Sequence, residues 1–425
     1  MNNNNQHIPA GYKLSPLGPI PEDWEVKRLG EIGDFSKGNG VPKDKIIKDE
    51  HGHPCLTYGD LYTKYDFVIK DIKSFIDDVV ASESKEIHIG DICFAGSGET
   101  PEDIGKCAAY IEEKTAYAGG DIIILSPNKD IDSIWLSYVL NSDIGGKQRY
   151  KSAQGFSIVH IYPDNLKRIQ IPTLSLKEQH RIVSVLQLWD TAIEKQTALI
   201  EKLTLRKRGL MQQLLTGKKR LKGFSGEWKE VRLGEIGVFF KGGGVPKDKI
   251  TNSGNKCLTY GDLYTKYDFV ISDVKSYIDD HTANESVKIR YGDICFAGSG
   301  ETKEDIGKCA AFIDNEYGYA GGDIIVFRAN DCNPITLSYI LNSSDVIRQK
   351  SNMGQGHSVV HIYPYQLEKL LIKLPSRAEQ DAIATILMES DKEIELANKK
   401  LERLQEEKRG LMQVLLTGKK RIVKT

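Results

Sequence analysis

The sequence predicts two tandem, nearly identical α+β domains. Long helices separate and follow them, and are expected to pair as an antiparallel coiled coil about an approximate two-fold axis. Three observations support this fold class: a duplicated segment, a heptad pattern after each copy, and short β-rich runs within each copy. The segment Leu56–Ile124 matches Leu258–Val326 at an offset of 202 residues (258 − 56), and 18 of the 69 aligned positions differ. Solenoid repeats run from about 20 to 50 residues, so each copy is a domain with its own core.

The repeats also set the expected domain boundaries. Each copy is followed by a closely similar segment, Lys207–Arg220 after the first and Lys408–Arg421 after the second. The expected order is a flexible N-terminal segment at 1–20, a first domain at 21–173, a first helical region at 174–222, a second domain at 223–374 and a second helical region at 375–425.

Each domain is expected to contain an irregular, largely antiparallel sheet with a helix. Turns rich in Gly, Asp and Ser separate short runs of β-branched and apolar residues, which is typical of strands. In the first copy these runs are Phe67–Ile69, Ile87–Ile89, Asp91–Phe94 and Asp121–Leu125. A helix is expected near 131–140, with Asp132 or Ser133 at its start.

Apolar residues in both helical regions recur at alternating steps of four and three, which is a heptad seam. The predicted coiled-coil interface consists of Ile182, Leu186, Trp189, Ile193, Ile200, Leu203 and Leu210 with Ile383, Leu387, Ile394, Leu401, Leu404 and Leu411. Lys207 and Lys408 also fall on the seam, and Gly217 and Gly418 are expected to end the helices. Pairing of the helices as a rigid spacer is preferred, and packing of each helix on its own domain is the alternative.

Composition limits the function classes. Lys and Arg total 58 against 59 Asp and Glu, so the overall charge gives no sign of nucleic-acid binding, although local patches can still bind phosphates. Six of the seven cysteines recur in both copies, and neither a CxxC spacing nor a secretory signal is present. Reduced cysteines in a cytoplasmic protein are therefore expected. The chain lacks the run of about 18 apolar residues that a membrane span requires.

Known catalytic and metal-binding patterns are missing. Gly96–Thr100 and Lys37–Gly40 are glycine-rich, but neither ends in the Gly-Lys-Ser/Thr of a phosphate-binding loop. His51, His53 and Cys55 could suggest a metal site, but the matching stretch 252–257 contains no histidine. We therefore predict that the chain is not an enzyme and holds no metal.

Polar, basic and aromatic residues in the expected loops occur in both copies. Base edges need side chains with paired donors or acceptors, whereas phosphates need cations, hydroxyls or backbone NH groups. The candidates for DNA contact in the first copy are Lys37, Lys43, Tyr58, Lys64, Tyr65, Ser97, Thr100, Gln154, Ser157 and His160. Their counterparts are Lys241, Lys247, Tyr260, Lys266, Tyr267, Ser299, Thr302, Gln355, Ser358 and His361. A solvated lysine or a core tyrosine is the alternative at each position.

An ordered set of motifs resembles the specificity subunit of type I restriction–modification systems. The motifs are Trp24–Gly30, Gly90–Phe94, Gln154–Ser157 leading to Ile169–Pro172, Lys177–Gln179 with Arg181 and Ile182, and Leu210–Gly217. The second half repeats most of them at Trp228–Gly234, Gly292–Phe296, Gln355–Ser358, Glu379–Gln380 and Leu411–Gly418, and departs at Leu374–Ser376. The resemblance covers essentially the whole chain.

The resemblance implies a non-catalytic subunit with two target-recognition domains, each reading one half of a split site in double-stranded DNA. It also implies that the helices dock two methyltransferase subunits, and that motor and nuclease subunits complete the complex. S-adenosylmethionine and adenine methylation belong to the methyltransferase partner, so this chain itself needs no cofactor.

Duplication adds a prediction of its own. Two nearly identical domains about a two-fold axis are expected to read the same short sequence on opposite strands. The target is then palindromic and split, with a gap set by the helices and half-site centres about one helical turn apart. Substitutions between the copies cluster from Val79 to Ile89, which predicts a surface away from the duplex. Two alternatives stay open: a coiled-coil scaffold that binds a symmetric protein partner, and a module left from a fused enzyme.

Overall fold

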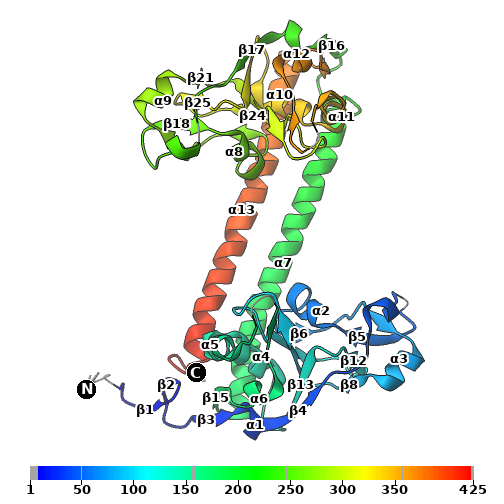
Figure 1. Cartoon of the computed structure of the whole chain (residues 1–425), viewed down its shortest axis with the longest axis vertical. Helices are drawn as coiled ribbons and strands as arrows, with labels where there is room; N and C mark the ends of the chain where they lie inside the picture. The colour runs from blue at the N-terminus through cyan, green and yellow to red at the C-terminus, as the bar shows by residue number, and fades with distance from the viewer. Residues whose placement is uncertain (1–7, 49, 156–157, 246, 357, 423–425) are drawn as a thin grey trace. The chain divides into compact units, whose positions relative to one another are not determined.

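The computed structural model describes residues 8–48, 50–155, 158–245, 247–356 and 358–422 (Figure 1). It divides into two compact units, and each unit is described by itself. Unit 1 contains residues 1–196 and 400–425, and unit 2 contains residues 197–399. Each unit thus includes one globular domain, a part of the first long helix and a part of the second.

A five-stranded main sheet forms the centre of each domain. In unit 1 its order is β4 (Gly33–Lys37), β13 (Ile122–Pro127), β9 (Ile92–Ala95), β11 (Cys107–Tyr110) and β6 (Val68–Ile69). In unit 2 the order is β17 (Gly237–Lys241), β26 (Ile324–Ala329), β22 (Asp293–Ala297), β24 (Cys309–Phe312) and β19 (Val270–Ile271). All neighbours are antiparallel except the last pair in each sheet. The expected mixed fold is confirmed.

A second, four-stranded sheet and one short helix form what we call the outer lobe. In unit 1 it consists of β7 (Phe75–Ile76), β5 (His53–Leu56), β12 (Ala116–Ala118), β8 (Lys85–Ile87) and α3 (Asp78–Glu83). In unit 2 it consists of β20 (Ser276–Ile278), β18 (Asn255–Leu258), β25 (Gly318–Ala320), β21 (Val287–Ile289) and α9 (Asp280–Asn284).

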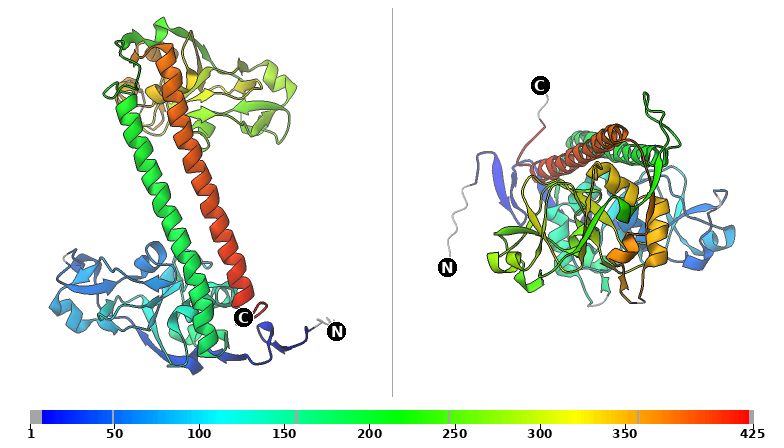
Figure 2. Two further views of the ribbon diagram at one scale, coloured as in Figure 1. Left: turned by 180° about the vertical axis from the view of Figure 1, so that it is seen from behind. Right: turned by 90° about the horizontal axis from the view of Figure 1, so that it is seen from above.

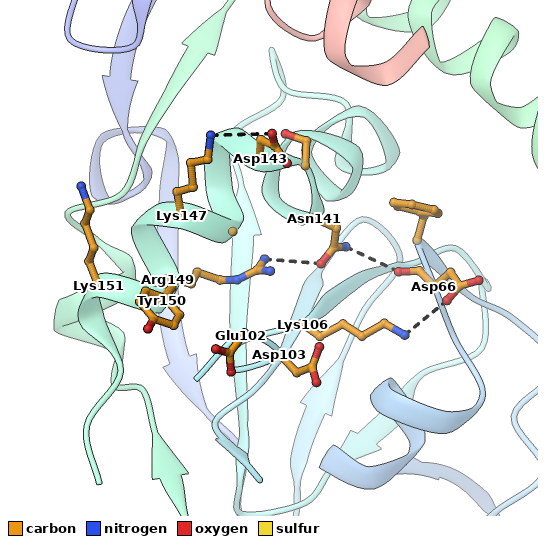
Figure 3. Close-up of a pocket in the computed structure, with 13 residues that line it drawn as sticks. Asp66, Glu102, Asp103, Lys106, Asn141, Asp143, Lys147, Arg149, Tyr150 and Lys151 are labelled. Atoms are coloured by element: carbon orange, nitrogen blue, oxygen red, sulfur yellow. Dashed lines mark hydrogen bonds and ion pairs between the residues drawn. The ribbon is translucent and has the colours of Figure 1, made fainter. Parts of the chain in front are cut away.

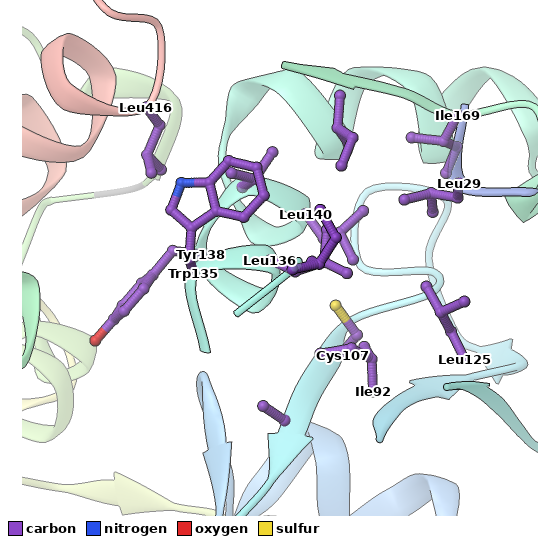
Figure 4. Close-up of a cluster of buried hydrophobic side chains, with 14 of the residues drawn as sticks. Leu29, Ile92, Cys107, Leu125, Trp135, Leu136, Tyr138, Leu140, Ile169 and Leu416 are labelled. Atoms are coloured by element: carbon purple, nitrogen blue, oxygen red, sulfur yellow. The ribbon is translucent and has the colours of Figure 1, made fainter. Parts of the chain in front are cut away.

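One helix packs on a face of each main sheet, and a second helix packs against the first. They are α4 (Ser133–Asn141) and α5 (Asp143–Ser152) in unit 1, and α10 (Pro334–Leu341) and α11 (Ser344–Met353) in unit 2. The helix expected near 131–140 is α4, and the Asp132 carboxylate caps it by accepting a hydrogen bond from the Trp135 amide at 2.8 Å. Trp135, Leu136 and Leu140 of α4 are fully buried. Leu136 and Leu140 face Cys107 and Ile92 of the sheet, and the Trp135 ring lies beside Leu416 (Figure 4).

Short elements complete each domain. Those of unit 1 are β1 (Tyr12–Ser15), β2 (Gly18–Pro21), β3 (Glu25–Arg28), α1 (Leu29–Ile32), η1 (Lys43–Lys45), α2 (Tyr58–Thr63), β10 (Ser97–Gly98), β14 (Val159–His160), α6 (Pro163–Leu166) and β15 (Gln170–Thr173). Those of unit 2 are β16 (Lys229–Arg232), η2 (Leu233–Glu235), η3 (Lys247–Lys249), α8 (Tyr260–Thr265), β23 (Ser299–Gly300), β27 (Val360–His361), α12 (Pro364–Leu367) and β28 (Leu371–Leu374).

The described part of the N-terminal segment expected at 1–20 contains a hairpin. Strands β1 and β2 pair as a hairpin, with Tyr12 opposite Pro21. The Tyr12 hydroxyl donates a hydrogen bond to the Gly418 carbonyl at 2.7 Å, so this hairpin is tied to the last residues of the second long helical region.

The two long helices are α7 (Leu176–Leu214) and α13 (Arg377–Leu415). In each unit, parts of both run side by side in opposite directions (Figures 1 and 2). Ion pairs fix this direction. In unit 1, α7 residues Glu178 and Asp190 pair with Arg421 and Lys408. In unit 2, Lys207 and Arg220 pair with Asp391 and Glu379.

The helices pack on the domains as well as beside each other. Ile182 and Leu186 of α7 lie in the unit 1 core together with Met412 and Leu415 from the end of α13. Unit 2 repeats this arrangement with Ile383, Leu387, Leu214 and Leu215. The first part of each apolar stripe therefore packs on its own domain. This was the alternative to helix pairing in the interpretation of the heptad pattern. Leu203 is buried, and the other predicted interface residues are half-buried. In the part of the chain that the structure describes, no helix is long and apolar enough to cross a membrane.

Candidate nucleic-acid interface

Glycine-rich turns meet at one edge of the unit 1 main sheet. A Cβ atom on Gly38 would collide with the Gly119 carbonyl, and one on Gly96 would lie 2.8 Å from the Asp121 carbonyl oxygen. Gly119 in turn packs against the Leu56 carbonyl at the end of β5, two residues before α2. Only glycine permits such close backbone packing, so these positions explain the glycine-rich stretches of the sequence. Lys37, at the end of β4, is exposed beside this edge.

A serine and a histidine lie opposite each other where β10 pairs with β14. The distance from Ser97 Oγ to His160 Nδ1 is 3.0 Å, and the distance from Ser299 Oγ to His361 Nδ1 in unit 2 is also 3.0 Å. Ser97 is 5% exposed, whereas His160 is half-buried. The sequence singled out both residues in each copy, and the structure brings them together.

A tight turn presents the histidine. The backbones of Gln154 and His160 exchange two hydrogen bonds, of 3.0 and 2.7 Å, and the Gln154 side chain is exposed. Gly155 has φ +116°, and a Cβ atom there would collide with the Ile158 carbonyl. The same turn occurs in unit 2, where Gly356 has φ +120°. This region of φ favours glycine, so the turn depends on it.

Sequence reasoning missed Tyr62. Its hydroxyl donates to the Ser97 carbonyl at 3.1 Å, and Tyr264 makes the same 3.1 Å bond to Ser299. Burial raises the pKa of Tyr62 to about 12, so its hydroxyl stays a donor at neutral pH. Tyr58 precedes Tyr62 by one turn of α2 and is 39% exposed. The four-residue spacing of the two tyrosines was the available signal.

These groups define a surface that we call the loop surface. In unit 1 it consists of Lys37, Tyr58, Tyr62, Ser97, Gln154 and His160, and in unit 2 of Lys241, Tyr260, Tyr264, Ser299, Gln355 and His361. The loop surface combines an exposed cation, hydroxyls, amides, imidazoles and glycine turns. It has the chemistry that binds both phosphates and base edges.

The remaining predicted residues have other surroundings. Lys64 forms an ion pair with Asp60 at 2.6 Å, Thr100 donates to Asp103 at 3.0 Å, and Lys43 is exposed in η1. Tyr65 is 9% exposed and packs in a hydrophobic core, which agrees with the alternative of a core tyrosine.

The second copy is similar but not identical in these positions. Lys266 pairs with Asp262 at 2.7 Å, Thr302 donates to Asp305 at 2.9 Å, and Tyr267 donates to the Asp273 carbonyl at 2.9 Å. Ser358 is exposed. Ser157 and the side chain of Lys247 lie outside the part of the chain that the structure describes.

A buried cation supports the loop after β10. Arg149 of α5 is 5% exposed and donates to the Leu140 carbonyl at 2.6 Å, and its pKa is lowered by burial. In unit 2, Lys350 takes this place and donates to the Gly307 carbonyl at 2.6 Å. Gly105 and Gly307 pack against the two side-chain stems. No sequence motif marks this cation.

The adjoining pocket, of about 630 Å³, does not add net positive charge (Figure 3). Lys106 pairs with Asp66 at 3.2 Å, and Lys147 lies 3.7 Å from Asp143. Glu102 also lines it. Cations and carboxylates thus neutralise each other, so this pocket is a poor site for phosphate. Among the described residues, no group of three or more His, Cys, Asp or Glu side chains could hold a metal ion.

Within the closely matching segment Leu56–Ile124, substitutions between the copies gather in the outer lobe and its adjoining loops. Of the 18 differences in this segment, 15 lie at 70–89 and 112–116, and the other three are at positions 101, 110 and 124. The two stretches are adjacent because β12 pairs with β8, with Ala116 opposite Ile87. Every loop-surface residue is identical in the two copies.

The fold is that of a duplicated protein with two similar α+β domains, and comparison with known proteins shows its family. The chain belongs to the family of type I restriction modification DNA specificity domains, whose model matches residues 21–205 and again 225–406. Specificity subunits of this family are non-catalytic, and methyltransferase and nuclease subunits complete the enzyme complex.

Relatives of known type resemble the chain over nearly its whole length. The putative type I restriction enzyme MjaX specificity subunit of Methanocaldococcus jannaschii is 28% identical, with 97% of both chains covered. The MjaVIII specificity subunit of the same organism is 25% identical, with 95% of this chain and 94% of the relative covered. The crystal structure of the S subunit from M. genitalium has a similar fold, with a TM-score of 0.58 at 16% identity over 98% of both chains.

Proposed function

We propose that each domain, 21–173 and 223–374, reads one half of a split DNA site through its loop surface, and that the two half-sites form a palindrome. The main support is that the loop surfaces have the same residues and the same geometry in both copies, including the 3.0 Å serine–histidine pairs. Identical surfaces present identical donors and acceptors, and these select identical base sequences.

The distribution of substitutions supports the same proposal. The two copies have diverged where the outer lobe faces solvent, for example at Val79, which is 69% exposed, and its counterpart His281. They have not diverged at Gly96–Thr100 or at Tyr58–Tyr62. A pair of domains reading different half-sites would be expected to differ at these loops.

The long helices supply the remaining part of the proposed function. We expect the regions 174–222 and 375–425 to set the unspecified gap between the half-sites and to dock two methyltransferase subunits, which bind S-adenosylmethionine and methylate adenine. Restriction subunits would join the same complex. Exposed apolar residues on α7, such as Leu188 and Leu205, at 71% and 64% exposure, provide contact area for such partners.

Single-molecule methylation mapping tests the proposal. DNA is taken from cells that express this chain together with its neighbouring methyltransferase subunit. A single palindromic split motif, methylated on both strands, is the expected result. An asymmetric split motif would contradict the argument from identical loop surfaces. If this chain adds no methylation, the scaffold that binds a symmetric protein partner becomes the better reading.

A further inference from the structure

The serine–histidine pairs have the composition of a hydrolytic site but not its geometry. A nucleophilic serine needs an accessible hydroxyl and a histidine that a third polar group orients. Ser97 and Ser299 are only 5% and 4% exposed. Within the described residues, no carboxylate forms a hydrogen bond with His160 or His361. The pairs therefore need another explanation. The same 3.0 Å distance in both copies indicates that the contact is a regular part of the fold.

We propose that Ser97 and Ser299 are positioning residues that fix the tautomers of His160 and His361, so that each ring presents its Nε2–H group to duplex DNA. This inference rests on the proposed function of the loop surface. It goes beyond that function by assigning the hydrogen-bonding role of each histidine and the residue that sets it.

The serine hydroxyl decides the tautomer. A buried hydroxyl proton needs an acceptor, and leaving it without one is costly. Among the described residues, His160 Nδ1 is the one hydrogen-bond partner of Ser97 Oγ. If Nδ1 were protonated, it would donate to Oγ, and the hydroxyl proton would have no acceptor. The favoured arrangement is therefore Oγ–H donating to an unprotonated Nδ1, which leaves the proton of the neutral ring on Nε2.

The surroundings hold the ring in place. The Ser97 carbonyl accepts the Tyr62 hydroxyl, and the His160 backbone bonds twice to Gln154. The Tyr162 ring stacks at 6.4 Å on the imidazole of His160. Across the described residues, Nε2 of His160 has no hydrogen-bond partner. The ring thus offers one oriented donor, suited to guanine N7 or O6, thymine O4 or a phosphate oxygen.

Nitrogen NMR on the full-length chain tests the tautomer without any DNA. The chain is labelled with ¹⁵N-histidine and measured at a series of rising pH values until the imidazole signals no longer change, and signals are assigned with H160Q and H361Q. The Nε2–H form is expected at both positions, and a mixture of tautomers is expected in S97A/S299A. An Nδ1–H form in the wild-type chain would overturn the proposal.

Binding to a duplex that carries the mapped motif tests the consequence. We expect S97A/S299A to bind about tenfold more weakly, because the imidazole that donates a hydrogen bond to DNA would no longer be held in one tautomer. S97T/S299T, which keeps the hydroxyl, should recover most of the affinity. The control S84A/S286A removes one serine hydroxyl from the outer lobe of each copy, away from the loop surface, and should bind normally. A shifted tautomer in S97A/S299A with unchanged binding would overturn the role in DNA contact.

A second variant identifies the acceptor on DNA. If the acceptor is a base, H160A/H361A should relax the sequence preference at one position of each half-site. If the acceptor is a phosphate, the same variant should weaken all sequences equally and leave the salt dependence unchanged, because a neutral imidazole neutralises no phosphate charge. Unchanged affinity and motif would contradict both. Failure of the wild-type chain to bind any duplex would refute the proposed function while leaving the NMR result intact.

Discussion

Lys408 forms an ion pair with Asp190 across the two helices of unit 1, and its ammonium nitrogen lies 3.9 Å from the centre of the Phe67 ring. The Tyr138 hydroxyl donates to the same carboxylate. Unit 2 repeats the cluster with Lys207, Asp391, Phe269 and Tyr339. In each unit one buried cation therefore ties both long helices to a domain.

Removal of this lysine should destabilise unit 1. Burial lowers the pKa of Lys408, so its charge depends on Asp190 and on the aromatic rings. In K408M, the Asp190 carboxylate would lose its cation. We expect a loss of about 3 kcal/mol in the free energy of unfolding, measured by urea titration.

Two further variants show whether the lost stability of K408M comes from the unpaired Asp190 carboxylate. D190N/K408M removes both charges and should recover part of the stability. R403M breaks the exposed pair with Glu407 on α13 and should change little. Equal losses in R403M and K408M would show that the burial of the cluster is unimportant.

The turn that presents His160 should depend on Gly155. Alanine at this position would have φ near +116° and would collide with the Ile158 carbonyl. We expect G155A/G356A to cost about 1–3 kcal/mol per site and to abolish binding to the methylated motif. Thermal unfolding and duplex binding are the measurements.

A matched control for this change lies a short distance along the chain. Gly146 is inside α5, and a Cβ atom there would meet no heavy atom within 4 Å. G146A should leave binding unchanged and stabilise the helix by about 0.5–1 kcal/mol. Loss of binding in G146A as well would mean that the domain tolerates no added methyl group, and the special role of Gly155 would be lost.

Exchange of the outer lobe between the copies should leave the DNA target unchanged. In the exchanged variant, residues 70–89 and 112–116 take the sequence of 272–291 and 314–318, which makes these two stretches alike in both copies. Methylation mapping should return the wild-type motif, because the loop surface is untouched. Q154A, on the loop surface, is the comparison and should weaken or alter methylation. A changed motif after the exchange would place base contacts in the outer lobe.

The local patterns of the sequence predicted much of this fold. The runs at 91–94 and 121–125 are β9 and the start of β13, the helix near 131–140 is α4, and both long helices end before the expected glycines. Each of these depends on residues close in sequence. Hydrophobic periodicity and capping signals are therefore sufficient to find them.

Features that depend on distant pairing were not predictable. Ser97 and His160 were both candidates, but their contact requires β10 to pair with β14 across 63 residues. The outer lobe joins 85–87 to 116–118 through strand pairing, so the clustering of substitutions there was only partly visible. The apolar stripe of α7 has one period whether it faces α13 or the domain. Periodicity alone could not show that Ile182 lies in the unit 1 core.

Alkaline pH should unfold the protein through its buried thiols. Burial raises the pKa of Cys55 and Cys107 to about 12 and that of Cys257 and Cys309 to about 11, and holds those of Cys93 and Cys295 well above 9.0. The unfolded chain releases these protons from about pH 9, whereas the native chain keeps them. The native state binds more protons, so stability is fully present below pH 9 and falls as pH rises toward 11 or 12.

The size of this effect makes it measurable. Each thiol that stays protonated in the native state costs about 1.4 kcal/mol per pH unit above its unfolded pKa. Lys350 and Lys408 act in the opposite sense because burial lowers their pKa, but they are two groups against six thiols. Urea midpoints at pH 7, 9 and 10, with a reductant present, should fall steeply above pH 9. C93A/C295A removes two thiols and should fall less steeply. Parallel curves for the two proteins would show that other groups cause the loss.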